Sequence, residues 1–196
     1  MRELNRDRAR QLLQDHRPFD ALERQHLSRT LELVEGSDCC GQRDHFKPGH
    51  LTASGSVLSP DRRSVLLIEH AKLERWLQPG GHLEADDADF KEAARREVRE
   101  ETGLEHLDTD PRLEGLFDVD VHLIPSHGGD PEHLHFDLRY LFIAPHAEVT
   151  AGDGVRSARF WPLDGIQKRF DTPSLYRPLL KIRRSTHDLY SRGGTG

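Results

Sequence analysis

The sequence predicts an α/β or α+β fold in which β-strands are interspersed with helices. Short apolar runs of strand length recur between turn residues, and amphipathic stretches of helix length stand before, between and after them. At 196 residues the chain has the length of one ordinary domain with an extension. We divide it into a helical extension over residues 1–45, a main domain over 46–190 and a disordered tail over 191–196.

The N-terminal extension is predicted to form two helices, at residues 4–15 and 19–35. The second helix carries an approximate apolar stripe. Asp20 is suited to cap its N-terminus, and Gly36 follows its end. An apolar stripe has to be covered, so we expect this pair of helices to pack on the main domain or on a second subunit of a homodimer.

The first half of the main domain is predicted to contain three strands and one helix. Residues 64–70 are nearly all apolar, which is typical of a strand in the middle of a sheet. Gly103 is expected to terminate the helix. In order, the elements are expected at residues 52–58, at residues 64–70, from Trp76 to a turn at Pro79–Gly81, and from Asp89 to Thr102.

The second half alternates polar and apolar residues along two predicted strands, near residues 113–123 and 134–144. Successive side chains of a strand point to opposite faces of the sheet, so each of these strands has one strongly polar face. The polar face carries Asp118, Asp120, His122, His133, His135, Asp137 and Arg139. A strand near 157–161, a short helix at 163–169 and a helix at about 173–188 complete the domain.

Composition argues against several classes of function. The formal charge of −6 disfavours nucleic-acid binding, which depends on a basic surface. No apolar run approaches the roughly 18 residues that a membrane span needs. The N-terminus also lacks the apolar core of a signal peptide. We therefore expect a cytoplasmic protein with no membrane partner, in which the adjacent Cys39 and Cys40 stay reduced.

The most informative stretch runs from Arg96 to Leu104. Glu97, Glu100 and Glu101 stand at positions i, i+3 and i+4 and therefore share one face of a helix. Like charges at this spacing destabilise a helix, which indicates that a positive group compensates them. Carboxylates on a rigid element suit Mg²⁺. The simpler interpretation, a solvated charged face, does not explain the glycine pair upstream or the glycine stop.

This stretch resembles the Nudix signature, Gly-x5-Glu-x7-Arg-Glu-U-x-Glu-Glu-x-Gly-U, in which U is a bulky aliphatic residue. The second half matches at every defined position, namely Arg96, Glu97, Val98, Glu100, Glu101, Gly103 and Leu104. The first half contains one extra residue. Counting back from Arg96 reaches Ala88 at the position of the first Glu, whereas counting forward from Gly81 reaches Asp87. Asp87 would then stand in for that Glu.

The resemblance covers roughly residues 48–165 and implies a mixed sheet sandwiched between helices. It also implies an enzyme in which water activated at Mg²⁺, or at Mn²⁺, hydrolyses a diphosphate linkage in a nucleoside diphosphate derivative. Such small-molecule substrates include nucleoside triphosphates, nucleotide sugars and ADP-ribose. The implied metal ligands are Glu97, Glu100, Glu101 and the backbone carbonyl of Gly80. The residues implied in catalysis are Glu100, Glu101 and Arg96, and Arg96 would orient a glutamate.

Residues outside the signature are further candidates. The resemblance implies that another acid often ligates metal or acts as base, and the candidates are Asp118, Asp120, Glu132 and Asp137. His122, His133 and His135 either line the substrate pocket with Asp137 or hold a transition metal. The alternative is a polar sheet face that is simply solvated. Trp76 either stacks on a nucleobase or fills the core.

Two other functions stay open. One is an isomerase resembling the isopentenyl diphosphate type, which shares the fold and uses a His-rich metal site. The other is a non-catalytic, nucleotide-sensing module. Because all three helical glutamates are present, hydrolysis is the favoured prediction.

Overall fold

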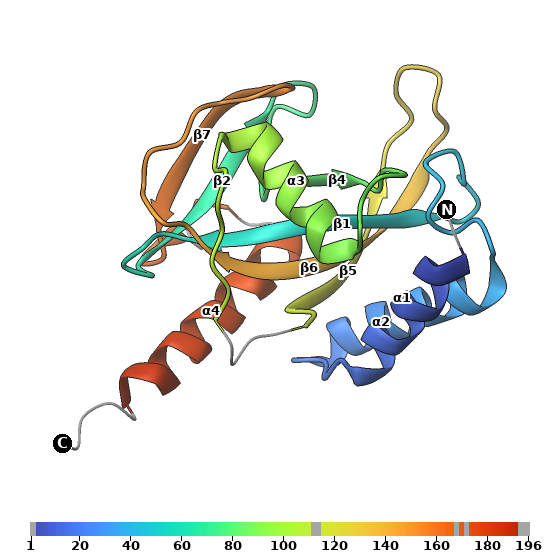
Figure 1. The fold of residues 1–196 in the computed structure, drawn as a ribbon, viewed down its shortest axis with the longest axis horizontal. Helices are drawn as coiled ribbons and strands as arrows, with labels where there is room; N and C mark the ends of the chain where they lie inside the picture. The colour runs from blue at the N-terminus through green and yellow to red at the C-terminus, as the bar shows by residue number, and fades with distance from the viewer. Residues whose placement is uncertain (1–2, 111–114, 167–168, 171–172, 192–196) are drawn as a thin grey trace.

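The computed structural model describes residues 3–110, 115–166, 169–170 and 173–191 and confirms the mixture of strands and helices (Figure 1). Within these residues, seven strands form one mixed sheet and four helices surround it. Helix α3 (Phe90–Thr102) covers one face of the sheet, and α4 (Pro173–Ser191) lies on the other. Helices α1 (Glu3–Asp15) and α2 (Ala21–Gly36) stand beside one edge. The predicted sandwich is therefore present.

Strand β1 lies in the middle of the sheet. It runs parallel to β6 and antiparallel to β2 and β4. The order across the sheet is β3-β2-β1-β6-β5, with β4 also paired to β1 and β7 also paired to β2. The strands are β1 (Gly49–Leu58), β2 (Ser64–His70), β3 (Arg75–Leu77), β4 (Gly80–His82), β5 (Asp118–Ile124), β6 (His133–Ile143) and β7 (Val155–Pro162).

Local sequence explains the ends of the helix that carries the three glutamates. Asp89 caps α3, because its carboxylate accepts the backbone N–H groups of Lys91 and Glu92 at 2.8 and 2.9 Å. At the other end Gly103 adopts a φ of 70°, in the left-handed region, and its N–H donates to the Arg99 carbonyl at 2.8 Å. Both ends agree with the sequence prediction.

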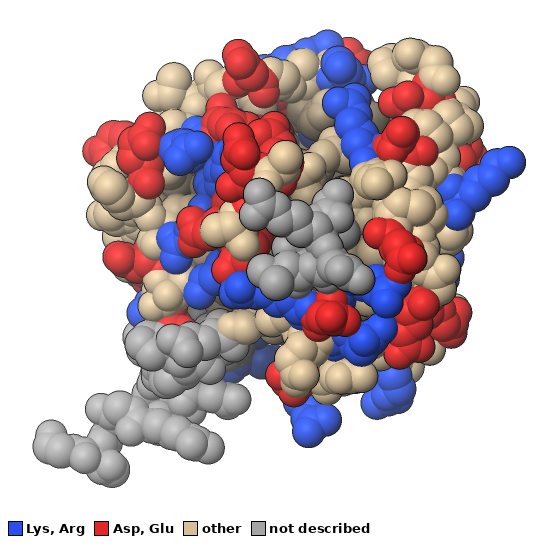
Figure 2. All heavy atoms as spheres, turned by 45° about the vertical axis from the view of Figure 1, so that its right-hand side comes forward, with Lys and Arg blue, Asp and Glu red and all other residues tan. Residues whose placement is uncertain are grey.

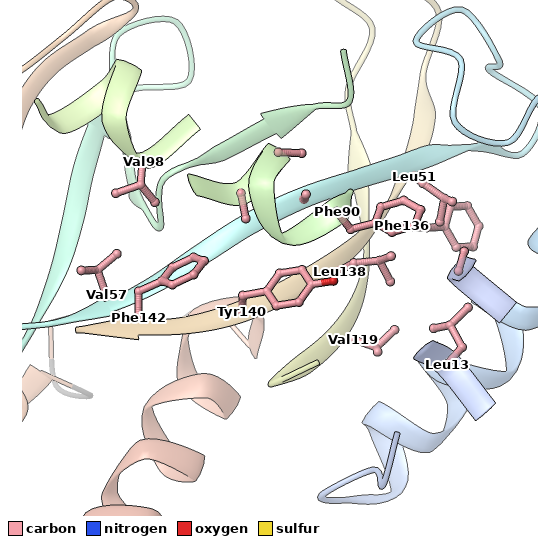
Figure 3. Packing of buried hydrophobic residues seen from close by; sticks show 14 of the residues in the cluster. Leu13, Leu51, Val57, Phe90, Val98, Val119, Phe136, Leu138, Tyr140 and Phe142 are labelled. Atoms are coloured by element: carbon pink, nitrogen blue, oxygen red, sulfur yellow. The ribbon is translucent and has the colours of Figure 1, made fainter. Parts of the chain in front are cut away.

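Apolar side chains fill the space between α3 and the sheet, and they fix the distance of that helix from β1. Figure 3 shows aromatic rings of β6 packed beside apolar side chains of α3 and α1. The approach is closest at Gly55 of β1, where an added Cβ would lie 2.6 Å from Val98 Cγ2. On the other face a second apolar cluster joins β2, β6 and β7 to α4.

The N-terminal helices cover the open edge of strand β5. The N–H of Val119 donates to Glu23 Oε1 at 3.2 Å, and the N–H of Val121 donates to His26 Nδ1 at 3.2 Å. Side chains of α2 thus satisfy backbone donors that an edge strand would otherwise expose. The pair of helices packs on its own domain, and a homodimer remains a prediction.

Three sequence predictions need adjustment. Residues 80–82 form strand β4 rather than the end of a turn, because Gly80 pairs with Ser54 of β1. Residues 163–165 form a bend and a turn, and not the predicted start of a helix, because Gly165 takes a φ of 81°. Of the predicted tail, Ser191 ends α4 and the rest lies outside the described residues. Within the described residues, every helix is too short or too polar to cross a bilayer.

The carboxylate of Glu23 is expected to stabilise the fold by an amount that falls at acid pH. Burial by itself would raise the pKa of its carboxyl, but hydrogen bonds from His16 and Lys181 hold that pKa well below the ordinary 4.5. A carboxyl with a depressed pKa stabilises the fold above its unfolded-state pKa and loses that contribution as the pH falls. Glu23→Gln should therefore have a lower free energy of unfolding than wild type. The difference should be constant above about pH 5. Below pH 4.5 it should shrink by up to about 1.4 kcal/mol per pH unit.

Urea unfolding between about pH 7 and pH 3 measures this difference. The matched control is Glu32→Gln, which changes an exposed glutamate of the same helix. A difference between wild type and Glu23→Gln that stays constant down to the lowest pH would contradict the prediction.

Candidate active site

The glutamate face of α3 meets strand β4 at its two glycines. The N–H of Gly80 donates to Glu101 Oε2 at 3.0 Å. At Gly81 an added Cβ would lie 2.7 Å from Glu97 Oε1, so only glycine leaves this carboxylate in place. The glycine pair therefore serves close approach between strand and helix.

Arg96 ties two of the glutamates to the surrounding loops. Its Nε and Nη2 atoms donate to the two carboxylate oxygens of Asp87 at 2.9 and 3.1 Å. Its Nη1 donates to Glu97 Oε1 at 3.0 Å and to Glu100 Oε2 at 3.1 Å. Its Nη2 also donates to the carbonyl of His82 in β4 at 2.8 Å. Arg96 is thus a positioning residue that holds helix, loop and strand in one geometry.

Asp87 lies in the loop before α3, where one extra residue is accommodated without changing the helix. The loop is closed by the N–H of Glu84, which donates to Asp87 Oδ2 at 2.7 Å. Because the helix begins only at Phe90, the spacing of the three glutamates is independent of the loop length. Asp87 accepts two hydrogen bonds from Arg96, one on each carboxylate oxygen. Any further role of Asp87 in the site remains a prediction.

The electrostatics of the three glutamates fit a bound cation. Burial raises the pKa of the Glu101 carboxyl to about 8, the Gly80 N–H opposes the rise, and the charges of Glu97 and Glu100 add to it. Burial also raises the pKa of the Glu97 carboxyl, against the effect of Arg96. These carboxylates are destabilised in their charged form despite the arginine. A divalent cation, which prefers oxygen ligands, matches this donor set.

A loop that the sequence analysis did not single out supports the end of α3. The N–H of Thr150 donates to the Thr102 carbonyl at 2.9 Å, and the N–H of Gly152 donates to the Glu101 carbonyl at 3.0 Å. A Cβ at Gly152 would clash with the Glu100 carbonyl. This loop therefore holds the backbone of Glu101 and of the residue after it, Thr102.

The polar faces of the central strands form rows across the sheet. Register pairs place His50, His135 and His122 in one row, Thr52, Asp137 and Asp120 in the next, and Ser54, Arg139 and Asp118 in the third. Apart from His122 and His135, which are partly buried, these side chains are buried. The alternative of a solvated polar face is therefore wrong, because α4 and the neighbouring side chains cover it.

Asp137 is fully engaged by donors from β1, β6 and the loop before β4. Its Oδ1 accepts Thr52 Oγ1 at 3.2 Å, and its Oδ2 accepts Ser54 Oγ at 2.8 Å. Gln78 Nε2 and Arg139 Nε add hydrogen bonds to Oδ2 at 3.1 and 2.8 Å. This geometry favours a role in fixing the sheet over metal ligation or proton transfer.

Asp118 and Asp120 belong to a buried ion-pair network with α4. Arg177 donates to Asp118 Oδ1 and to Asp120 Oδ1, each at 2.9 Å. Arg139 donates to Asp120 Oδ2 at 2.8 Å, and Lys181 donates to Asp118 Oδ1 at 3.0 Å. Their charges are therefore compensated within the fold, which leaves less reason to assign them a metal or a catalytic proton.

Five histidine rings gather at the other end of this polar face, namely His50, His82, His122, His133 and His135. The ring centroids of His50 and His135 are 4.8 Å apart, and those of His50 and His133 are 5.0 Å apart. Burial lowers the pKa of His50 to about 4, so the ring is neutral near pH 7. His50 and His82 are absent from the sequence predictions. The predicted strand began at Thr52. If it had been extended by two residues toward the N-terminus, the alternation of side chains would have placed His50 on the same face as Thr52.

The remaining predicted residues are Trp76 and Glu132. Trp76 packs against Trp161 and Phe170, with ring centroids at 5.1 and 6.4 Å, and Arg159 stands 4.8 Å from the Trp76 ring. Glu132 is exposed in the loop before β6. A role for either in substrate binding remains a prediction.

Residues 49–181 match the NUDIX domain, which is more than half of the chain. The chain therefore belongs to the Nudix family, and it is a Nudix-type pyrophosphohydrolase.

Two relatives illustrate the similarity. A protein of Lactococcus lactis subsp. cremoris named "Probable DHNTP pyrophosphohydrolase" is 31% identical over 130 residues, which cover 65% of this chain and 74% of the relative. The crystal structure of a C. elegans Ap4A hydrolase binary complex matches 70% of this chain and 98% of that one, with 17% identity and a TM-score of 0.52. At this identity the structural match shows the fold alone.

Gly81→Ala is expected to lower activity while the fold persists. The new Cβ would meet the Glu97 carboxylate at 2.7–2.8 Å, and this flexible side chain can move whereas the backbone cannot. A shift of about 1 Å at a site residue can cost roughly a hundredfold in rate. Hydrolysis assays beside a thermal melt measure both effects. Gly36→Ala is the control, because its added Cβ meets no atom of the described residues within 4 Å. Equal activity in both variants would contradict the prediction.

Proposed function

We propose that this protein hydrolyses a diphosphate linkage in a nucleoside diphosphate derivative, with Mg²⁺ as its cofactor and Mn²⁺ as a substitute. The observation that carries the proposal is the glutamate face of α3, where burial and like charge raise the pKa of the Glu101 carboxyl to about 8. Carboxylates that are destabilised in their charged form favour the binding of a divalent cation. A bound cation in turn suits a substrate of dense negative charge.

Glu97, Glu100, Glu101 and the Gly80 carbonyl would hold the cation. When bound, Mg²⁺ neutralises phosphate charge and lowers the pKa of a water ligand. Other residues of the chain position these carboxylates. Arg96 keeps the carboxylates of Glu97 and Glu100 on one side of the guanidinium. Gly80 keeps Glu101 against β4 through its N–H.

The substrate is proposed to be a small molecule. Acidic and basic side chains are interspersed over the face shown in Figure 2, and the formal charge is −6. Both observations favour a discrete nucleotide-type ligand over a nucleic acid, which would need a basic surface. The name of the Lactococcus lactis relative adds DHNTP to the compounds worth testing.

A substrate panel tests the proposal. The full chain, stripped of metal, is incubated with nucleoside triphosphates, nucleotide sugars, ADP-ribose, Ap4A and DHNTP, each with Mg²⁺, with Mn²⁺ or with EDTA. Products are separated by chromatography. We expect cleavage within the phosphate chain of at least one compound with Mg²⁺ and none with EDTA. Absence of cleavage throughout would overturn the proposed class of substrate and the proposed cofactor.

A further inference from the structure

We propose that His50, His133 and His135 form a second metal site, selective for a transition-metal ion such as Zn²⁺. One ring nitrogen from each of the three residues lies within 4.8 Å of those of the other two. None of the three belongs to the glutamate face of α3. The site is thus distinct from the proposed magnesium site and does not depend on the proposed hydrolysis.

The hydrogen bonds of two rings engage Nδ1 and leave Nε2 as the nitrogen that can bind a metal. His50 Nδ1 lies 3.3 Å from the carbonyl of His45, and His133 Nδ1 lies 2.8 Å from the carbonyl of Pro131. A carbonyl only accepts, so each Nδ1 carries the proton and each Nε2 keeps its lone pair. Metal-binding histidines have this arrangement, in which a backbone carbonyl orients the ring from behind.

Two ring nitrogens of the cluster are otherwise unsatisfied. His50 Nε2 and His135 Nε2 are buried and have no hydrogen-bond partner among the residues that the structure describes. A buried polar atom without a partner is unfavourable, because it has lost its hydrogen bonds to water. Two such atoms from neighbouring strands, aimed into one cluster of rings, point to a bound ligand that accepts lone pairs. A metal ion meets that requirement by binding the lone pair that a neutral imidazole keeps on its unprotonated nitrogen.

The sheet holds the three residues in place. His50 and His135 are a register pair of the parallel strands β1 and β6. His133 is two residues before His135 and therefore shares its face of the sheet. The ring of Phe46 packs on His133, with centroids 5.0 Å apart. Adjacent strands fix the backbone of the three residues, so rotation of the side chains is the movement left to bring the ring nitrogens together.

The ligand set decides the class of ion. Imidazole nitrogens suit zinc, cobalt, nickel and copper, whereas magnesium takes oxygen ligands. In a tetrahedral zinc site, ligand nitrogens stand about 3.3 Å apart, so the rings would close by roughly 1 Å each on binding. Three imidazoles leave a fourth position for water or an anionic oxygen.

Metal titration tests the site. The full chain is freed of metal with EDTA, returned to excess Mg²⁺ so that the carboxylates are occupied, and titrated with Zn²⁺ by calorimetry. A parallel titration with Co²⁺ follows visible absorption, which is intense only in tetrahedral sites. We expect one equivalent of Zn²⁺ and an intense Co²⁺ band. Weak Zn²⁺ binding of no defined stoichiometry, or a pale octahedral Co²⁺ spectrum, would overturn the proposal.

Variants assign the ligands. His133→Gln and His135→Gln should each weaken Zn²⁺ binding at least a hundredfold and abolish the Co²⁺ band. His146→Gln, which changes an exposed histidine, and Glu101→Gln should leave both unchanged. Circular dichroism confirms that each variant is folded, and if one fails to fold the other decides. Unchanged binding in a folded ligand variant, or loss of binding in Glu101→Gln alone, would refute the assignment.

Discussion

Glu101→Gln is expected to lower kcat/KM for Mg²⁺-dependent hydrolysis by roughly a thousandfold. The amide keeps the size of the side chain and can still accept the Gly80 N–H, which now binds Glu101 Oε2 at 3.0 Å. It loses the charge that would hold the cation. Charge stabilisation by a metal ion is worth several kcal/mol, and each 1.36 kcal/mol corresponds to about a factor of ten in rate.

The same variant should keep or gain stability when metal is absent. Burial raises the pKa of the Glu101 carboxyl to about 8, so ionising it in the folded state costs free energy, and this cost grows as the pH rises from the ordinary 4.5 toward that value. Glutamine removes the cost. We therefore expect a melting temperature in EDTA that is no lower than that of wild type. Added Mg²⁺ should raise the melting temperature of wild type more than that of the variant.

Glu92→Gln is the matched control for this experiment. Glu92 lies in the first turn of the same helix, is about half exposed and pairs with Arg95 at 3.2 Å. It should keep near-normal activity. Activity in Glu101→Gln within tenfold of wild type would refute its role as a cation ligand, whatever the melting temperature.

Asp118→Ala should be strongly destabilising, by about 3–5 kcal/mol, because it removes a buried carboxylate that several buried cations share. Asp118 is fully buried. Its carboxylate accepts two hydrogen bonds from Arg177, both at 2.9 Å, and one each from Lys181 and Arg139 at 3.0 and 3.3 Å. These cations come from α4 and β6, so one substitution loosens the attachment of a helix to the sheet.

Urea unfolding measures the free energy of unfolding of this variant. Asp153→Ala, at an exposed loop position, should change it by less than about 0.5 kcal/mol. A loss below about 1 kcal/mol in Asp118→Ala would mean that the network behaves like exposed surface ion pairs. That result would also reopen a functional role for Asp118 and Asp120.

Helix α3 could be predicted from sequence because its determinants are local. Its N-cap Asp89, its stop at Gly103 and its three glutamates all lie within one short segment. Periodicity therefore places the carboxylates on one face before any tertiary contact is known. The same holds for the alternation of polar and apolar residues along β5 and β6, which the structure confirms.

The surroundings of those residues depended on contacts between distant segments. Asp120 and Arg177 are 57 positions apart in the chain, and Thr52 and Asp137 are 85 apart. Alternation places Asp120 and Asp137 on a polar face but cannot say whether water or an arginine faces them. The same limit applies to the N-terminal helices. Their apolar stripe predicts that one face is buried, but it does not predict which surface covers that face.

By itself, the sequence determined the class of protein and the helix that carries its glutamates, since a local motif needs only the period of a helix. Tertiary structure decided that Gly80 and Gly81 form a strand against β1, that α2 covers the edge of β5, and that His50 joins His133 and His135. The physical reason is register: pairing between strands brings together side chains whose separation along the chain carries no periodic signal.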